Sequence, residues 1–185
     1  QKAILDARYA LPTYRSDQNY VGSRGRGFGE IVHYIPPPPE FVPSLMAGLA
    51  ASAVRMDTVP ALVQAAVLGF AFVLIHPFDD GNGRLHRFLL HDVFTRRGVF
   101  PSGTALPLSA AIVAEPPAYD RVLEAFSKPL MAQIVYTKDY DGRVTVANPG
   151  EVEGVYRYPD LTPHVEYLAT VLDRALTDPR GLDGA

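Results

Sequence analysis

The sequence feature that most constrains the fold is a long apolar segment that runs directly into a tight, charged turn. Residues 61–75 carry no charged side chain, and Thr58 as N-cap with Pro60 as a first-turn proline predicts a helix over this range. A helix that is apolar all round is typical of the buried centre of a helical bundle. Pro77 disfavours helical geometry at His76, so this histidine is expected where the helix ends.

The turn that follows contains Gly-Asn-Gly flanked by a histidine, two aspartates and two arginines, all within residues 76–87. Residues 85–97 then predict an amphipathic helix that starts near Gly83, because apolar side chains recur at helical spacing. These side chains are Leu85, Phe88, Leu89, Val93 and Phe94. Arg84 and Arg87 lie near the helix start, where the helix dipole disfavours each cation by roughly 0.3–1 kcal/mol.

Arg84 and Arg87 are three residues apart and therefore share one face of the expected helix. Free N–H groups at a helix start, glycines that permit close approach and two guanidinium groups all suit phosphate oxygens. Local preferences that are broken together in one place indicate function. We therefore interpret residues 76–87 as a polyphosphate site.

Size and composition exclude several classes of protein. The chain has 185 residues, 48% of them hydrophobic, and a net charge of −3, which predicts one domain and argues against disorder or nucleic-acid binding. The absence of cysteine excludes disulfides and thiolate metal sites and fits a reducing compartment. Residues 61–75 are too short to span a bilayer comfortably. We expect a cytoplasmic protein with no membrane partner, and delivery as an effector stays open.

The rest of the pattern predicts a mostly α-helical chain with two β-hairpins. Further helices are expected at 2–10, 44–54, 106–115, 119–131 and 162–176, with Pro116-Pro117 between the third and the fourth. Alternation in 31–35 behind a glycine-rich turn predicts the first hairpin, and residues 134–137 and 143–147 predict the second. Pro36–Pro39 is expected to be a rigid connector and the tail from Asp178 to be frayed.

Residues 76–87 resemble the signature of the Fic family, His-x-Phe-x-[Asp/Glu]-Gly-Asn-Gly-Arg-x-x-Arg, at every fixed position. The resemblance extends over about residues 14–176 and implies a Fic (Fido) helical bundle with a β-hairpin flap and a second small hairpin. It divides the chain into an N-terminal helical lead-in (1–13), a Fic core with the flap at 22–35 (14–132), and a C-terminal hairpin and helix (133–185). The chain begins at Gln1, not Met, so sequence upstream of it is compatible with this division.

The resemblance implies transfer of AMP from ATP to a Ser, Thr or Tyr hydroxyl of a target protein. His76 would be the general base, for which a pKa near neutrality is expected. Asp80 would hold Mg²⁺. The structural alternative for Asp80 is an i,i+4 ion pair with Arg84. Asp79 is expected to be solvated.

The same resemblance assigns the phosphate contacts. Asn82 and the N–H groups around Gly81 and Gly83 would form an anion hole for the α-phosphate, and Asn82 is therefore grouped with the catalytic residues. Arg84 and Arg87 would bind the β- and γ-phosphates. A lysine at the position of Gly83 goes with kinase-like transfer, so the glycine favours AMP transfer.

Three neighbours of the motif residues are expected to have structural roles. Phe78 would plug the core and fix the loop, and Leu85 would face the core. His86 is expected to be exposed.

The flap is implied to dock the target protein as an added strand, although an ordinary surface hairpin is an equal alternative. Many Fic proteins carry an inhibitory helix, [Ser/Thr]-x-x-x-Glu-[Gly/Asn], whose glutamate pairs with the second motif arginine. Here only Thr162 to Glu166 has the spacing, and Tyr167 follows, so we interpret them as an N-cap and a first-turn acid. A separate inhibitory segment and a homodimer stay open.

Other functions also fit parts of this sequence. His91-Asp92 in a helical chain fits an HD-type metal phosphohydrolase, which needs further His and Asp ligands on neighbouring helices. The motif could also belong to a catalytically inactive binding module, but a binder needs no general base such as His76. Within the Fic fold, de-AMPylation and transfer of UMP or phosphocholine are further alternatives.

Overall fold

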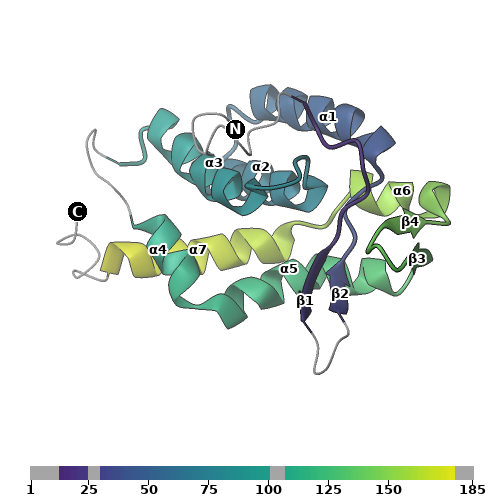
Figure 1. Ribbon diagram of the computed structural model, residues 1–185. Coiled ribbons are helices and arrows are strands. Elements are labelled where there is room, and N and C mark those ends of the chain that lie inside the picture. Colours follow the sequence, from purple (N-terminus) through teal and green to yellow (C-terminus); the bar gives the residue numbers. More distant parts are fainter. Residues whose placement is uncertain (1–12, 25–29, 101–106, 178–185) are drawn as a thin grey trace.

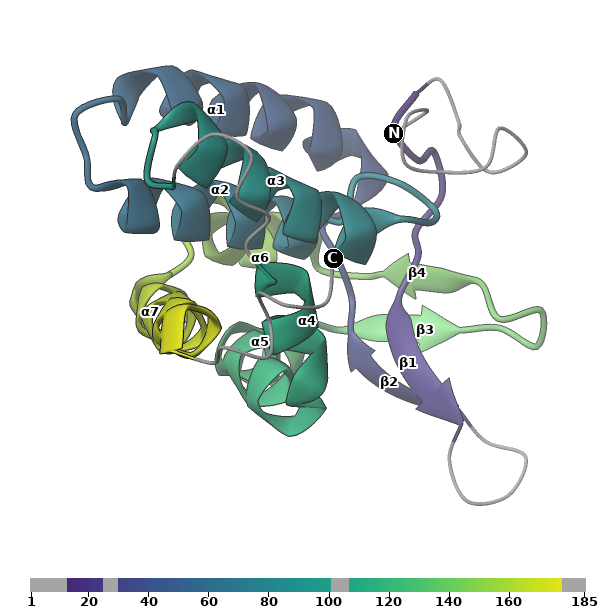
Figure 2. The same cartoon turned by 90° about the vertical axis from the view of Figure 1, so that its left-hand side faces the viewer.

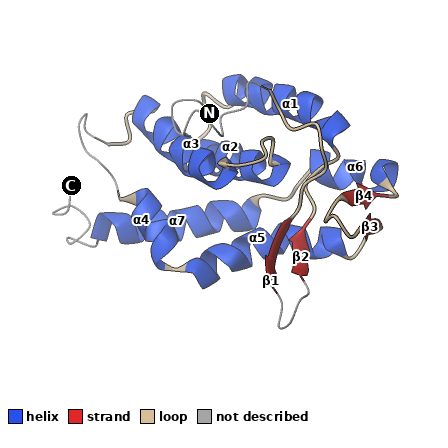
Figure 3. Cartoon of the chain, in the orientation of Figure 1, coloured by secondary structure: helices blue, strands red, loops and turns tan. Residues whose placement is uncertain are grey.

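The protein folds into a mostly helical assembly with two small antiparallel hairpins, as the sequence predicts (Figures 1 and 3). The computed structural model describes residues 13–24, 30–100 and 107–177. The expected helix at 2–10, the glycine-rich turn at 25–29 and the tail from Asp178 lie outside these ranges. Within them the helices are α1 (Val42–Arg55), α2 (Ala61–Ile75), α3 (Asn82–Arg96), α4 (Leu108–Ala114), α5 (Pro116–Met131), α6 (Pro149–Arg157) and α7 (Thr162–Thr177), with a 3-10 turn at Pro39–Phe41 before α1.

Helix α2 is the centre of the bundle, as its apolar sequence predicts. It packs against α1, α3 and α7, and ten of its residues are buried. Figures 1 and 2 both show α1, α2 and α3 on one side of the bundle and α4, α5 and α7 on the other. Gly69 allows a close approach of α3, because a Cβ atom there would lie 2.5 Å from Cδ2 of Leu90. No helix in the described ranges has the length and apolar character needed to cross a bilayer.

Several helix ends differ from the prediction. Thr58 does not cap α2: Pro60 is the cap residue, with an extended ψ of 137°, and its carbonyl accepts the first hydrogen bond from Gln64. Pro116 and Pro117 form the first turn of α5, where their missing N–H groups cost nothing, so they do not link two helices. Thr162 is the first residue of α7, and Asp160 caps it by accepting its N–H at 2.9 Å.

Helix α6 was not predicted. It follows Asn148-Pro149 directly, and Val152 and Tyr156, four residues apart, bury one face of it. The two buried residues are too few to form a periodic pattern in a nine-residue segment, but Pro149 at the first turn was a usable start signal.

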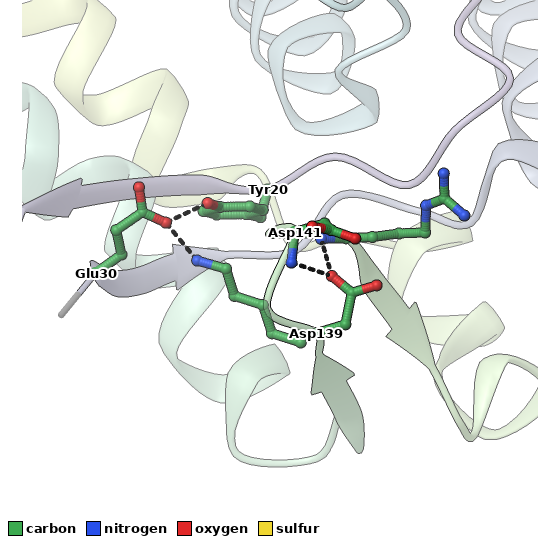
Figure 4. Close-up of polar contacts among 6 residues, drawn as sticks. Tyr20, Glu30, Asp139 and Asp141 are labelled. Atoms are coloured by element: carbon green, nitrogen blue, oxygen red, sulfur yellow. Dashed lines mark hydrogen bonds and ion pairs between the residues drawn. The ribbon is translucent and has the colours of Figure 1, made fainter.

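The two hairpins lie side by side and are joined by side-chain contacts (Figures 2 and 4). The flap consists of β1 (Val21–Arg24) and β2 (Glu30–Tyr34), and the second hairpin of β3 (Tyr136–Lys138) and β4 (Val144–Val146). Glu30 accepts hydrogen bonds from the Tyr20 hydroxyl and the Lys138 ammonium, whose Nζ also lies 4.5 Å from the centre of the Tyr20 ring. The turn of the second hairpin is held by Asp139, which accepts the N–H of Asp141 and of Arg143 at 3.1 and 2.7 Å.

Candidate active site

His76 lies at the junction of α2 and the motif loop, where the sequence places it, but in an unusual backbone conformation. Its φ and ψ are 51° and 57°, which makes it the one non-glycine residue in the described ranges with a positive φ. A left-handed conformation costs a residue with a Cβ atom about 1–2 kcal/mol. The surrounding contacts must supply this free energy, and such residues concentrate at functional sites.

The imidazole of His76 is oriented by one hydrogen bond. Its Nδ1 lies 3.2 Å from the carbonyl oxygen of Val73, which assigns the proton to Nδ1 and leaves Nε2 as an acceptor. Burial lowers the pKa of His76 to about 4, and the nearby guanidinium of Arg15 acts in the same direction. This pKa is lower than the near-neutral value expected from the sequence. At pH 7 the ring is therefore neutral and able to take up a proton.

Asp80 and Arg84 form the ion pair that was the structural alternative for these residues. Arg84 Nη2 lies 3.1 Å from Asp80 Oδ2, and the two side chains are 47% and 60% exposed. The other carboxylate oxygen, Oδ1, accepts the N–H of Gly81 at 2.6 Å. Asp79 is exposed, as expected. An exposed pair of this kind is worth about 0.2–1 kcal/mol, so it can exchange for a ligand at little cost.

The side chain of Asn82 braces the loop. It is only 2% exposed; its Oδ1 accepts the N–H of Phe78 at 3.1 Å and its Nδ2 donates to the carbonyl of Phe78 at 2.6 Å. The ring of Phe78 in turn packs against Tyr14 and Phe72, with centroid distances of 5.8 and 6.3 Å. Both ends of the Asn82 side-chain amide are thus engaged within the loop.

The predicted site residues surround one polar cavity of about 310 Å³. Its lining consists of His76, Asp79, Asp80, Gly81, Asn82, Gly83, Arg84 and Arg87. A second cavity of about 410 Å³ adjoins it and shares His76 and Gly83. This second cavity lies between flap residues, such as His33 and Tyr34, and α5 residues, such as Asp120. His76 therefore faces both the polar cavity, which charged side chains line, and the larger, more apolar cavity.

Two expectations about α3 are wrong. His86 is not exposed: its exposed fraction is 0%, and its ring lies 4.8 Å from that of Phe70. Phe88, which was placed in the apolar stripe, is 52% exposed. The buried face of α3 is centred on Leu85, His86, Leu90, Val93 and Phe94, because α3 turns this face toward Gly69 on α2.

A second buried histidine, His164 of α7, also packs against the ring of Phe70. The centroids of these two rings are 4.8 Å apart, and the exposed fraction of His164 is 0%. None of the four ring nitrogens has a hydrogen bond of normal geometry to a described residue, although the backbone of Gly69 lies near the ring of His86. Burial lowers the pKa of each histidine to about 4. Both rings are neutral core groups at pH 7.

Arg15 is a residue that sequence reasoning missed. It is 3% exposed and donates to the carbonyls of His76, Asp17 and Pro37. Its position in a polar stretch, Tyr-Arg-Ser-Asp, gives no periodic signal and reads as a solvated loop. The structure instead places its side chain under the motif loop.

The metal-hydrolase alternative has no support in the structure. Asp92 is paired with Arg96 at 2.5 Å on the same helix. Within the described ranges, no three His, Cys, Asp or Glu side chains gather in a way that could hold a metal ion. His91-Asp92 therefore lacks the additional ligands that such an enzyme needs.

Comparison with known proteins points to one family. Residues 2–93 match the Fic/DOC family. A probable protein adenylyltransferase of Aquifex aeolicus, aq_aa38, is 33% identical over 66 residues, which are 36% of this chain and 21% of that protein. Protein adenylyltransferase fic-1 of Caenorhabditis briggsae is 34% identical over 92 residues, 47% of this chain and 16% of that protein. The chain thus spans about a fifth or less of the length of these relatives.

Solved structures agree in fold. A Fic family protein from Desulfovibrio desulfuricans superposes with a TM-score of 0.60 at 26% identity, over 95% of this chain and 42% of that one. A Fic domain containing signaling protein from Bacteroides thetaiotaomicron gives a TM-score of 0.60 at 23% identity, over 93% and 55% of the two chains. The predicted helical bundle with its hairpins is therefore confirmed.

Proposed function

Since this chain belongs to the Fic/DOC family, we propose that it is a protein adenylyltransferase that transfers AMP from ATP to a Ser, Thr or Tyr hydroxyl of a target protein. The observation that carries the proposal is the shared cavity of about 310 Å³. There a neutral histidine, His76, faces the same space as Asp80, Arg84 and Arg87. A site that only bound a nucleotide would need the cationic groups but not the base.

In the proposed reaction the target hydroxyl oxygen attacks the α-phosphorus of ATP. The new bond is O–Pα, the bond to the α,β-bridging oxygen breaks, and pyrophosphate leaves. The hydroxyl proton moves to Nε2 of His76, while the Nδ1–H group remains on the Val73 carbonyl. General-base assistance of this kind contributes about 10²–10⁴-fold to a rate.

A pKa of about 4 has two consequences for this base. The imidazole is nearly all in the neutral, competent form at pH 7, but it is a weak proton acceptor in the resting protein. Two acidic residues of the loop, Asp79 and Asp80, line the same cavity, and bound phosphates would add negative charge there. Negative charge beside the ring favours the imidazolium, so ATP itself would strengthen the base.

The triphosphate would bind at the start of α3. Arg84 and Arg87 supply guanidinium groups for the β- and γ-phosphates. The N–H group of Gly83 would serve the α-phosphate, together with that of Gly81 once Asp80 Oδ1 releases it. Gly81 has a φ of 86°, a conformation that suits glycine and turns the loop into the helix. Asn82 contributes by holding the loop in this shape through its two hydrogen bonds to Phe78.

Asp80 fits a magnesium ion that arrives with ATP. Mg²⁺ commonly binds one or two carboxylates and completes its shell with phosphate oxygens and water, and Asp80 presents an accessible carboxylate, 60% exposed, on the cavity. When bound, the ion would neutralise phosphate charge. Asp80 and Arg84 would separate to do so, each exchanging a weak ion pair for a phosphate-linked partner.

The nucleoside and the target would lie on the flap side of His76. The cavity of about 410 Å³ continues from the phosphate cradle past His76 and Gly83, so it is positioned to receive the sugar and base. The target segment would dock along the flap as an added strand, which supplies main-chain hydrogen bonds to β1 or β2. The contacts of Glu30 with Tyr20 and Lys138 would hold the flap in place for this (Figure 4).

The test is transfer of label from ATP to protein. The chain is incubated with a cell lysate and either α-labelled or γ-labelled ATP, and the labelled band is analysed by mass spectrometry. We expect α-label on a hydroxyl-bearing residue of a protein and no γ-label. H76A should abolish labelling while retaining the fold and ATP binding, and undiminished labelling by H76A would remove the histidine from the mechanism.

The same experiment separates the alternatives. Capture of γ-label alone would indicate kinase chemistry, and loss of AMP from a pre-labelled protein would indicate de-AMPylation. Labelling by α-labelled UTP in preference to ATP would indicate UMP transfer. No labelling by any nucleotide, with ATP binding retained, would leave a binding module.

A further inference from the structure

A single guanidinium joins three parts of the chain that meet at the base of the active site. Arg15 Nε donates to the carbonyl of His76 at 2.9 Å, and the backbone N–H of Arg15 donates to the carbonyl of Pro77, also at 2.9 Å. Its Nη2 donates to the carbonyl of Pro37, directly after the flap, and its Nη1 to that of Asp17 at 3.1 Å. One residue therefore binds the catalytic loop, the segment before the flap and the segment after it.

We propose that Arg15 is a positioning residue that holds the His76-Pro77 dipeptide in its left-handed turn, aims the imidazole of His76 and fixes it relative to the root of the flap. The inference deepens the proposed function and rests on it, because it gives Arg15 a role in the reaction assigned to His76. Arg15 itself touches neither of the two cavities that His76 faces.

The geometry of the clamp explains why the side chain must be arginine. The guanidinium of Arg15 donates to the carbonyl of His76 and the backbone N–H of Arg15 donates to that of Pro77, so two successive peptide groups are each held by one hydrogen bond, of which only the first depends on the side chain. His76 is the residue with the unfavourable positive φ, so this is where an external restraint is needed. A guanidinium presents donors in several directions from one rigid plane, whereas an ammonium is a compact group that cannot reach three separated carbonyls together.

The clamp also links the base to the place where the target is proposed to dock. The ring of His76 receives its direction from the Val73 carbonyl and from its own backbone, which Arg15 restrains. The same guanidinium binds Pro37, three residues after the end of β2 at Tyr34. A shift of the flap root would therefore move the carbonyl that Arg15 holds, and with it the position of the base.

Gln18 provides a matched control from the same segment. Its Nε2 donates to the carbonyls of Pro36 at 2.8 Å and Asn19 at 3.0 Å, so it also ties the start of the flap to the proline run. Within the described ranges Gln18 forms no hydrogen bond with His76 or Pro77. Substitution of Gln18 thus removes two hydrogen bonds beside the flap but leaves every hydrogen bond of Arg15 in place.

The test compares R15K, R15M and Q18M in the 185-residue chain by three measurements. The first is kcat and KM for ATP from α-label transfer, the second is ATP binding, and the third is the ¹⁵N NMR signal of the His76 ring without ligand, assigned by its loss in H76A. We expect R15K and R15M to lower kcat by about 10²-fold, the size typical of a misplaced catalytic group, while ATP binding changes little. In both arginine variants the ¹⁵N signals of the His76 ring should no longer be those of the Nδ1–H tautomer alone. Q18M should resemble the unsubstituted chain in all three measurements.

The outcomes separate this inference from the proposed function. If the unsubstituted chain transfers no α-label, the proposed function fails, and the ring signal alone decides whether Arg15 positions His76. If either arginine variant folds and keeps both kcat and the His76 ring signal, the inference is overturned. Equal losses in R15K, R15M and Q18M, or an unfolded protein for both arginine variants, would make Arg15 a part of the general framework and would also overturn it.

Discussion

Lowering the pH from 7 to 5 should destabilise the fold through His86 and His164. Both imidazoles are fully buried and have a pKa of about 4, whereas in the unfolded chain the value is about 6.5. Between these values the unfolded chain binds more protons than the folded one, so stability falls as the pH falls. For one such histidine the linkage relation gives a loss of about 2 kcal/mol between pH 7 and pH 5. That is a large share of a typical free energy of unfolding of about 5–15 kcal/mol.

The measurement is urea unfolding followed by circular dichroism at pH 7, 6 and 5. H86L and H164L should each reduce the loss between pH 7 and pH 5 by about 2 kcal/mol, whatever their effect on stability at pH 7. The pKa of His76 is also lowered to about 4, so His76 lowers the stability in the same direction. Because His76 is present in all of these proteins, its contribution cancels from the comparison. H33L, which removes an exposed histidine of the flap, is the control. A pH dependence that is the same in H86L and H164L as in H33L would refute the reasoning.

Three further substitutions test the packing around the site. G69A should cost about 1–3 kcal/mol in urea unfolding, because its Cβ would lie 2.5 Å from a leucine side chain of α3, and an unchanged midpoint would contradict this close contact. N82A should lower both stability, by about 1–3 kcal/mol, and α-label transfer, since it removes two hydrogen bonds to Phe78, and full activity would show that the loop needs no brace. K138M should change stability little, because the ion pair is exposed, but speed amide hydrogen exchange in the flap, since it removes the contact of Lys138 with Glu30, and unchanged exchange would show that the second hairpin does not restrain the flap.

The main elements could be predicted because their signals are local. The charge-free segment before His76 predicted a buried central helix, since its apolar character is carried by consecutive residues, and Pro77 predicted the end of that helix, since a proline restricts the residue before it. The motif placed seven site residues on one short turn, and a turn of that length brings them to one cavity. The hairpins followed from alternation and turn residues, although the two strands of the second hairpin are shorter than predicted.

The errors concern contacts between distant segments. The burial of His86 and the exposure of Phe88 depend on the direction from which α2 approaches α3, and Gly69 sets that approach from another helix. Hydrophobicity alone ranks phenylalanine above histidine for the core, so the pattern selected the wrong face. Arg15 is invisible in the sequence for the same reason, because its partner His76 is 61 residues away.

The ion pair of Asp80 with Arg84 shows a different limit. The sequence offered both a metal ligand and a helical ion pair, and the structure contains the pair. Because the pair is exposed and weak, its presence in the protein without ligand does not compete seriously with phosphate and Mg²⁺. The roles of these two residues therefore depend on a ligand that the sequence motif suggests and that the labelling experiments test.

Because the backbone of His76 is left-handed, the twelve motif residues are not expected to adopt this conformation outside the present fold. A peptide of residues 76–87, or the same letters grafted between two helices of an unrelated bundle, would lack the donors that Arg15 provides from far upstream. Freed from them, the chain at His76 would relax to an ordinary conformation, and the histidine would point elsewhere. Engineering this chemistry into a new scaffold would therefore require copying the segment around Arg15, which precedes β1, and the proline segment 36–39 together with the motif loop.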